Sequence, residues 1–268
     1  MTARGATRPS SAGDPLKRGY WDLSRVPIQI LIFLLPLVLF YEAAMVSILR
    51  HEEGNQVLTS TNLAHKGLLQ FFDTMGIEIS GWFLPGLALI AVLLAWQVIG
   101  RFAWTVDVRY LLLMLIESIL LALPLVVLGR LLHQLGSEAP NLFAPAASEL
   151  SQYGVSWRIA MSIGAGLYEE LVFRMLVIAL LHVILVDVAK LSERIGVTIA
   201  IAISAALFMM YHWFGGGPAS VGLLDNVFYL AAGGYFGLVF VVRGFGIVAA
   251  THALYDIAVV VVLPMITA

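Results

Sequence analysis

Long apolar stretches separated by short polar connections run along most of the chain. A helix needs about 20 predominantly apolar residues to cross a bilayer. Seven stretches come close to or exceed that length: residues 27–49, 81–100, 109–132, 156–186, 196–214, 226–242 and 246–266. The pattern predicts an all-α polytopic transmembrane bundle of seven spans, or eight if the unusually long fourth stretch contains a break.

The first 26 residues follow a different pattern, rich in Ser, Thr, Gly, Pro and Arg. Such a segment buries too little apolar surface to offset its conformational entropy, so we expect a disordered tail. Residues 27–268 are expected to form a single membrane-embedded helical domain. Because Lys and Arg concentrate on cytoplasmic connections, their distribution places the amino terminus in the cytoplasm. The cations assigned to that side are Arg4, Arg8, Lys17, Arg18, Arg25, Arg101, Arg109, Lys190, Arg194 and Arg243.

Composition strengthens the membrane assignment and removes several classes of function. The chain is 60% hydrophobic and 12% charged, whereas soluble domains are about 25% charged, so a soluble globular protein is excluded. The net charge of -2, without a basic cluster beyond the tail, indicates no nucleic-acid partner. The absence of cysteine excludes thiol nucleophiles, Cys-bound zinc and iron–sulfur clusters.

The fourth stretch contains a group of charges that its membrane location makes costly. Glu169, Glu170 and Arg174 lie within two helical turns, and each costs about 2.5–3.5 kcal/mol to insert at the centre of a span. Glu170 and Arg174 are four residues apart in the order that favours an ion pair. Glu169 points about 100° away, onto an adjacent face, and is therefore the candidate general base. The alternative is that all three charges only join helices.

Two later stretches add histidines at helical spacing. Phe208 and His212 are four residues apart in the fifth stretch, as are His252 and Asp256 in the seventh. Residues at this spacing share a helix face, so His252 and Asp256 can face a common cavity. Ser204, one turn before Phe208, is expected to pack between helices.

The ordered motifs E-E-x-x-x-R, F-x-x-x-H and H-x-x-x-D resemble those of the CAAX protease and bacteriocin-processing family, also called the Abi family. This family of intramembrane glutamic endopeptidases includes the Ras-converting enzymes. The resemblance covers about residues 156–266. It implies that Glu169 activates water with the help of His212, and that Glu170 is held by Arg174.

The resemblance further implies that His252, with the residue at position 256, stabilises the oxyanion. Position 256 is Asn in many members and Asp256 here; an ionised acid cannot donate a hydrogen bond, so Asp256 is either protonated or orients His252. Phe208 belongs to the supporting part of the motif. The implied reaction is metal-independent hydrolysis of a membrane-associated protein or peptide, and the expected location is the bacterial inner membrane.

Other chemistries have less support in the residues. The chain has no H-E-x-x-H helix and no G-x-S-x-G elbow. We expect no cofactor, although two histidines and two carboxylates can in principle bind zinc. A proton-coupled transporter using Glu42 and Glu117 as a relay, and a non-catalytic membrane scaffold, remain alternatives.

We expect spans four, five and seven to line a polar intramembrane cavity. At about 1.5 Å per residue, however, His212 lies near the outer end of its span and His252 near the inner start of a parallel one. Gly215–Gly217 suggests a helix that stops within the membrane.

Overall fold

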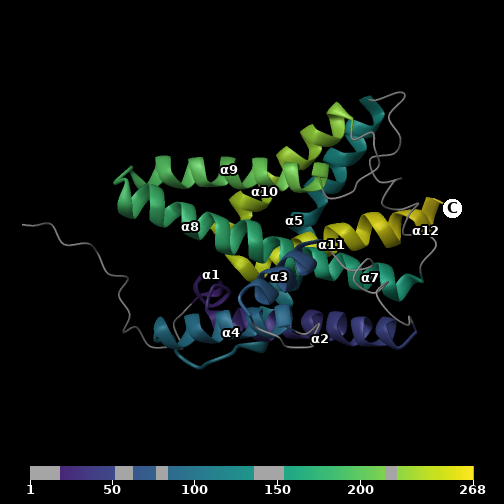
Figure 1. The fold of residues 1–268 in the computed structure, drawn as a ribbon. Coiled ribbons are helices and arrows are strands. Elements are labelled where there is room, and N and C mark those ends of the chain that lie inside the picture. Colours follow the sequence, from purple (N-terminus) through teal and green to yellow (C-terminus); the bar gives the residue numbers. More distant parts are fainter. Residues whose placement is uncertain (1–18, 52–62, 77–83, 136–153, 215–221, 268) are drawn as a thin grey trace, which may run out of the picture.

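A computed structural model gives the fold, and it describes residues 19–51, 63–76, 84–135, 154–214 and 222–267 (Figure 1). Within these ranges the regular structure is entirely helical, which confirms the predicted all-α class. The amino-terminal helices are α1 (Tyr20–Leu23), α2 (Pro27–His51), α3 (Leu63–Thr74), α4 (Leu84–Ile99) and α5 (Val108–Leu135). The carboxy-terminal ones are α7 (Val155–Gly164), η3 (Ala165–Glu169), η4 (Leu171–Ile178), α8 (Ala179–His182), η5 (Val183–Val188), α9 (Glu193–Phe214), α10 (Leu223–Arg243), α11 (Phe245–Ile257), η6 (Ala258–Val262) and α12 (Leu263–Thr267).

Six helices in the described ranges are long and apolar enough to cross a membrane, so the chain is a multi-pass membrane protein. They are Pro27–Ser47, Val108–Leu132, Val155–Val188, Glu193–Trp213, Leu223–Arg243 and Phe245–Ile266. The predicted span at 81–100 corresponds to the shorter apolar helix Pro85–Ile99, with residues 81–83 outside the described ranges. The predicted count of seven is therefore approximately right.

The fourth predicted span contains no break. Helix runs without interruption from Val155 to Val188, so no eighth span is formed there. Much of this helix, including η3, η4 and η5, has the wider π-helical turn, in which backbone hydrogen bonds join residues five apart.

The described structure begins within the segment predicted to be a tail. Residues 1–18 lie outside the described ranges, but Tyr20–Leu23 form the short helix α1. Tyr20 donates a hydrogen bond to Glu117 on α5, and Arg243 at the end of α10 pairs with the same carboxylate, with Nη2 2.8 Å from Oε2. Ordered structure thus begins before Pro27. Arg243, counted above as a cytoplasmic loop cation, is buried and its charge is compensated.

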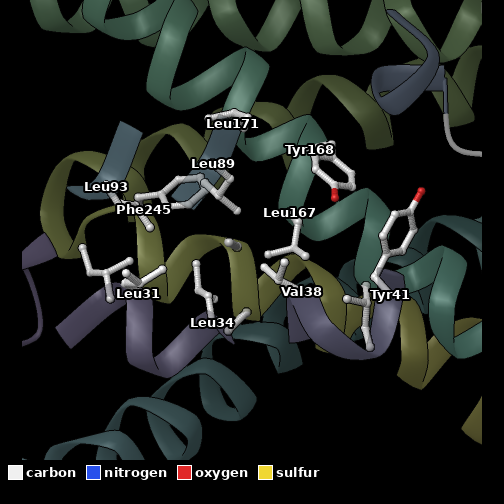
Figure 2. Close-up of a cluster of buried hydrophobic side chains, with 14 of the residues drawn as sticks. Leu31, Leu34, Val38, Tyr41, Leu89, Leu93, Leu167, Tyr168, Leu171 and Phe245 are labelled. Atoms are coloured by element: carbon white, nitrogen blue, oxygen red, sulfur yellow. The ribbon is translucent and has the colours of Figure 1, made fainter. Parts of the chain in front are cut away.

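A hydrophobic core joins α2 and α4 to α11 and to the long helix Val155–Val188, which carries Glu169, Glu170 and Arg174 (Figure 2). In Figure 2, Leu167 of η3 lies against Val38 of α2, and Tyr168 and Tyr41 face one another from the same two elements. Tyr168, directly before Glu169, is fully buried. This packing fixes η3, and with it the start of the charged motif, against two other helices.

The helices carrying the two histidine motifs are connected through α10. Helix α9 packs closely on α10, where a Cβ on Gly233 would come within 2.9 Å of the Ala205 backbone. In Figure 1, α10 is steeply inclined to α9. Helix α11 begins at Phe245, directly after Gly244, which has φ +87°. Because of this inclination, counting residues along the spans did not give the relative positions of His212 and His252. Gly215–Gly217 lie outside the described ranges.

Candidate active site

The charged motif is buried at the centre of the long helix. Glu169, Glu170 and Arg174 are 3%, 0% and 0% exposed. Gly166, one turn earlier, packs directly on α11: a Cβ at this position would lie 2.6 Å from both the carbonyl oxygen of Ala249 and the nitrogen of Ala253. The missing side chain allows α11 to approach closely enough for His252 to reach the carboxylates.

Glu170 is held from two sides. Arg174 Nε lies 3.1 Å from its Oε2, as the i, i+4 spacing predicted, and Nδ1 of His252 lies 2.8 Å from its Oε1. Since a carboxylate accepts, His252 is the donor through Nδ1–H. Glu170 therefore connects η4 to α11 and fixes the orientation of the imidazole.

The guanidinium of Arg174 is surrounded by aromatic rings. Its Cζ lies 4.4 Å from the ring centre of Phe208 and 5.4 Å from that of Phe236. A planar guanidinium combines such stacking with ionic contacts, which compensates part of the cost of burying its charge. Phe208, predicted as a supporting residue, thus lies next to the ion pair.

His212 points toward Glu169 rather than away from it. Its Nδ1 lies 2.9 Å from the carbonyl oxygen of Phe208, one turn earlier on α9. A carbonyl cannot donate, so Nδ1 carries the proton, and in the neutral ring Nε2 is an acceptor. Nε2 lies 3.8 Å from Oε2 of Glu169, and the ring stacks on Tyr229 of α10 with centres 4.2 Å apart.

Both histidines converge on the same carboxylate oxygen. Nε2 of His252 lies 4.0 Å from Glu169 Oε2, the atom that also faces His212. The two distances exceed a direct hydrogen bond but are suited to a small molecule held between the three atoms. The other oxygen, Oε1, accepts a 3.2 Å hydrogen bond from the hydroxyl of Tyr211.

Asp256 lies at the edge of this group. Its Oδ2 is 3.6 Å from Nε2 of His252, one turn earlier on α11. The His252 ring is thus surrounded by the carboxylates of Glu169, Glu170 and Asp256, and it stacks on Phe236 at 4.6 Å. The structure therefore brings together all seven predicted site residues, which lie on the long helix Val155–Val188, on α9 and on α11.

The remaining polar residues noted in the sequence have other partners. Ser204 donates to the carbonyl of Phe173 at 2.7 Å, which is the predicted packing role between helices. Glu42 accepts a 2.9 Å hydrogen bond from Tyr168, and Glu117 pairs with Arg243. The contacts of Glu117 are those of a structural ion pair.

Sequence reasoning missed three aromatic residues of the site. Tyr229 and Phe236 stack on the two histidines, and their spacing of seven residues, which places them on one face of α10, was the available signal. Tyr211 is adjacent to the predicted His212, but nothing in the sequence indicated that its hydroxyl reaches Glu169.

An apolar cavity of about 940 Å³ adjoins the site. Helices α3, α4 and η4 form its walls, and Tyr211 contributes to its lining. It is lined by Ala64, Gly67, Leu68, Phe71, Phe72, Ala88, Ala91, Val92, Leu171, Val172, Phe173, Leu176 and Tyr211. The side chain of Tyr211 thus lies between the cavity and Glu169, because it lines the cavity and its hydroxyl reaches the carboxylate.

Among the described residues, no group of three or more His, Cys, Asp or Glu side chains has the arrangement of a metal site. The polar groups that face Glu169 include one imidazole nitrogen of each histidine and the Tyr211 hydroxyl, and the carboxylates of Glu170 and Asp256 lie against His252. These groups can accept, donate and stabilise charge during acid–base chemistry.

Comparison with known proteins identifies a protein family for the carboxy-terminal part of the chain. Residues 151–258 match the family model of the type II CAAX prenyl endopeptidase Rce1-like proteins. Neither a curated protein nor a solved structure matches the chain. The matched region contains each of the seven site residues and supports a membrane-embedded peptidase in general terms. Residues 151–258 therefore form an Rce1-like domain of the CAAX protease family, as the order of the motifs indicated.

Proposed function

We propose that this chain is an intramembrane glutamic endopeptidase that hydrolyses a peptide bond of a membrane-associated protein or peptide. The observation that carries the proposal is the convergence of His212 and His252 on Oε2 of Glu169, at 3.8 and 4.0 Å. A water molecule in contact with these three atoms is positioned for activation by a base and for attack on a carbonyl carbon.

In this mechanism, Glu169 and His212 move the protons. As the water oxygen attacks the peptide carbonyl carbon, Glu169 takes one of its protons, assisted by the acceptor Nε2 of His212. The tetrahedral intermediate collapses when the C–N bond breaks and the nitrogen receives a proton from the same pair. The products are a carboxylate and an amine.

His252 is proposed to stabilise the negative charge on the carbonyl oxygen. Its Nδ1–H is already engaged with Glu170, so a donor at Nε2 requires the imidazolium form. The surrounding carboxylates compensate that positive charge, and Asp256, at 3.6 Å, orients the ring. Glu170 and Arg174 hold this arrangement together and do not contact the reacting atoms.

The substrate is proposed to reach the site from the bilayer, with an apolar part in the cavity beside Tyr211. The family to which the matched region belongs acts on CAAX prenyl proteins, so a prenylated peptide is a suitable first probe. We propose that the reaction needs no metal or cofactor, and that the protein lies in the bacterial inner membrane with its amino terminus in the cytoplasm.

Replacement of Glu169 by Gln tests the proposal. The purified full chain in proteoliposomes is assayed with an internally quenched farnesylated peptide and with an unlipidated transmembrane peptide. Because Gln keeps the shape but cannot act as a base, Glu169→Gln should lower kcat by about 10²–10⁴-fold, with an unchanged thermal unfolding midpoint.

The matched control is Glu193→Gln, the same change at an exposed residue in the first turn of α9, which should leave kcat unaltered. Wild-type turnover by Glu169→Gln would contradict the mechanism. Activity should persist after treatment with a chelator; its loss, and restoration by zinc, would support the zinc alternative instead.

A further inference from the structure

Tyr211 connects three parts of the molecule. Its hydroxyl donates to Oε1 of Glu169 at 3.2 Å, and the backbone N–H of Ala64, on α3, donates to the same hydroxyl. Its side chain also lines the apolar cavity. One phenol therefore contacts the carboxylate, the amphipathic helix α3 and the cavity.

The contact with Ala64 lies where α3 needs an acceptor. Ala64 is the second residue of α3, and the first four N–H groups of a helix have no partner within the helix. The Tyr211 oxygen supplies one. A hydroxyl that donates to a carboxylate is polarised to accept more strongly, so the two hydrogen bonds reinforce each other.

A second contact fixes the same end of α3. His65 is fully buried, and its Nδ1 lies 3.0 Å from the hydroxyl of Tyr41 on α2. Burial lowers the pKa of His65 to about 4, so the ring is neutral near pH 7, and a hydrogen bond joins its Nδ1 to the tyrosine hydroxyl. The start of α3 is thus attached to α2 and α9.

The hydrogen bond from Tyr211 also restricts how Glu169 can rotate. With Oε1 held by the hydroxyl, Oε2 is the oxygen presented to His212 and His252. A displacement of about 1 Å in a reacting group can reduce a rate about 100-fold. The orientation of this carboxylate is therefore important for any reaction that uses it as a base.

We propose that Tyr211 is a positioning residue, which orients the Glu169 carboxylate and makes that orientation depend on the docking of α3. This inference rests on the proposed function, in which Glu169 is the base. It adds that α3, a wall of the cavity, is connected to the Glu169 carboxylate through the Tyr211 hydroxyl.

Tyr211→Phe tests the first part, because it keeps the ring and the cavity lining and removes only the hydroxyl. With the farnesylated peptide or the unlipidated transmembrane peptide in proteoliposomes, kcat should fall about 10- to 100-fold while KM changes less than about twofold. The matched control is Tyr235→Phe, which removes a hydroxyl that donates to the Leu121 carbonyl at 2.7 Å, outside the site; it should leave kcat unchanged.

Ala64→Pro tests the second part. Proline removes the N–H of Ala64 at a first-turn position, where the helix itself does not use it, and leaves Tyr211 intact. It should also lower kcat. Independently of any substrate, hydrogen exchange of the amides at the start of α3 should become faster in Tyr211→Phe and stay unchanged in Tyr235→Phe.

Each alternative outcome is distinguishable. A kcat for Tyr211→Phe equal to that of Tyr235→Phe would overturn the positioning role, even when Glu169→Gln is inactive. A raised KM with normal kcat would assign Tyr211 to substrate binding instead. Normal activity of Ala64→Pro, or unchanged exchange in Tyr211→Phe, would overturn the dependence on α3. Full activity of Glu169→Gln would refute the proposed function itself.

Discussion

At the scale of single residues, the site is organised around a buried arginine. Arg174 is fully buried and compensates a carboxylate that also holds His252. Removing one member of a buried ion pair typically costs about 3–5 kcal/mol, because the remaining charge stays in a medium of low dielectric constant. Replacing both members by apolar side chains is often tolerated.

These energetics give a prediction for Arg174. Arg174→Met should lower the free energy of unfolding, measured by denaturation in detergent, by about 3–5 kcal/mol, whereas Arg194→Met, at an exposed position on α9, should have little effect. The double variant Arg174→Met/Glu170→Leu should recover most of the stability but stay inactive, because His252 has lost its partner. An active double variant would contradict the role given to Glu170.

At the scale of elements, the approach of η3 to α11 decides whether His252 and Asp256 on α11 come into contact with Glu169 and Glu170. Gly166 is the point of closest approach, with backbone atoms of α11 only 2.6 Å from where a Cβ would lie. The π-helical winding of η3 and η4 changes the angular offsets of the charged side chains on this helix. Packing and winding together set the position of Glu169 relative to His252.

Gly166→Ala should therefore separate the two helices. The added methyl group meets backbone atoms, which cannot move aside as a flexible side chain would, so we expect a loss of about 1–3 kcal/mol in stability and a strong decrease in kcat. Gly234→Ala is the matched control, because a Cβ there meets nothing within 4 Å. Equal activities of the two variants would show that the contact at Gly166 does not determine the geometry of the site.

At the scale of the whole molecule, the candidate active site lies beside an apolar cavity formed by helices far apart in the sequence. Helix α3 contributes Gly67 to this cavity, and a Cβ at Gly67 meets nothing within 4 Å. A larger side chain at this position is therefore accommodated by occupying the cavity, and it also removes the helix penalty of glycine, about 1 kcal/mol.

Gly67→Leu is accordingly expected to fold normally and to raise KM for the farnesylated peptide several-fold, with little change in kcat, in steady-state assays in proteoliposomes. Gln70→Leu adds the same side chain to an exposed position of α3 outside the cavity lining and should leave KM unaltered. An unchanged KM in Gly67→Leu would mean that the substrate does not enter this cavity.

Much of the site could be predicted because its signals are local. Glu170 and Arg174 pair as their spacing required, and His252 and Asp256 share a face of α11. The span boundaries and the start of the ordered chain were less predictable. The wider turns of residues 165–188 and the contacts of Tyr20 with Glu117 leave no periodic signal in the sequence.

The amino-acid sequence by itself determined that the chain is a helical membrane protein and which side chains are the candidate catalytic groups, because hydropathy and spacing along one helix are local properties. Only the tertiary structure decided that His212 and His252 meet at one oxygen of Glu169 and that Tyr211 holds the other. Those contacts depend on the distance and inclination between helices. Small residues such as Gly166 and Gly233 set these quantities by packing against partners elsewhere in the chain.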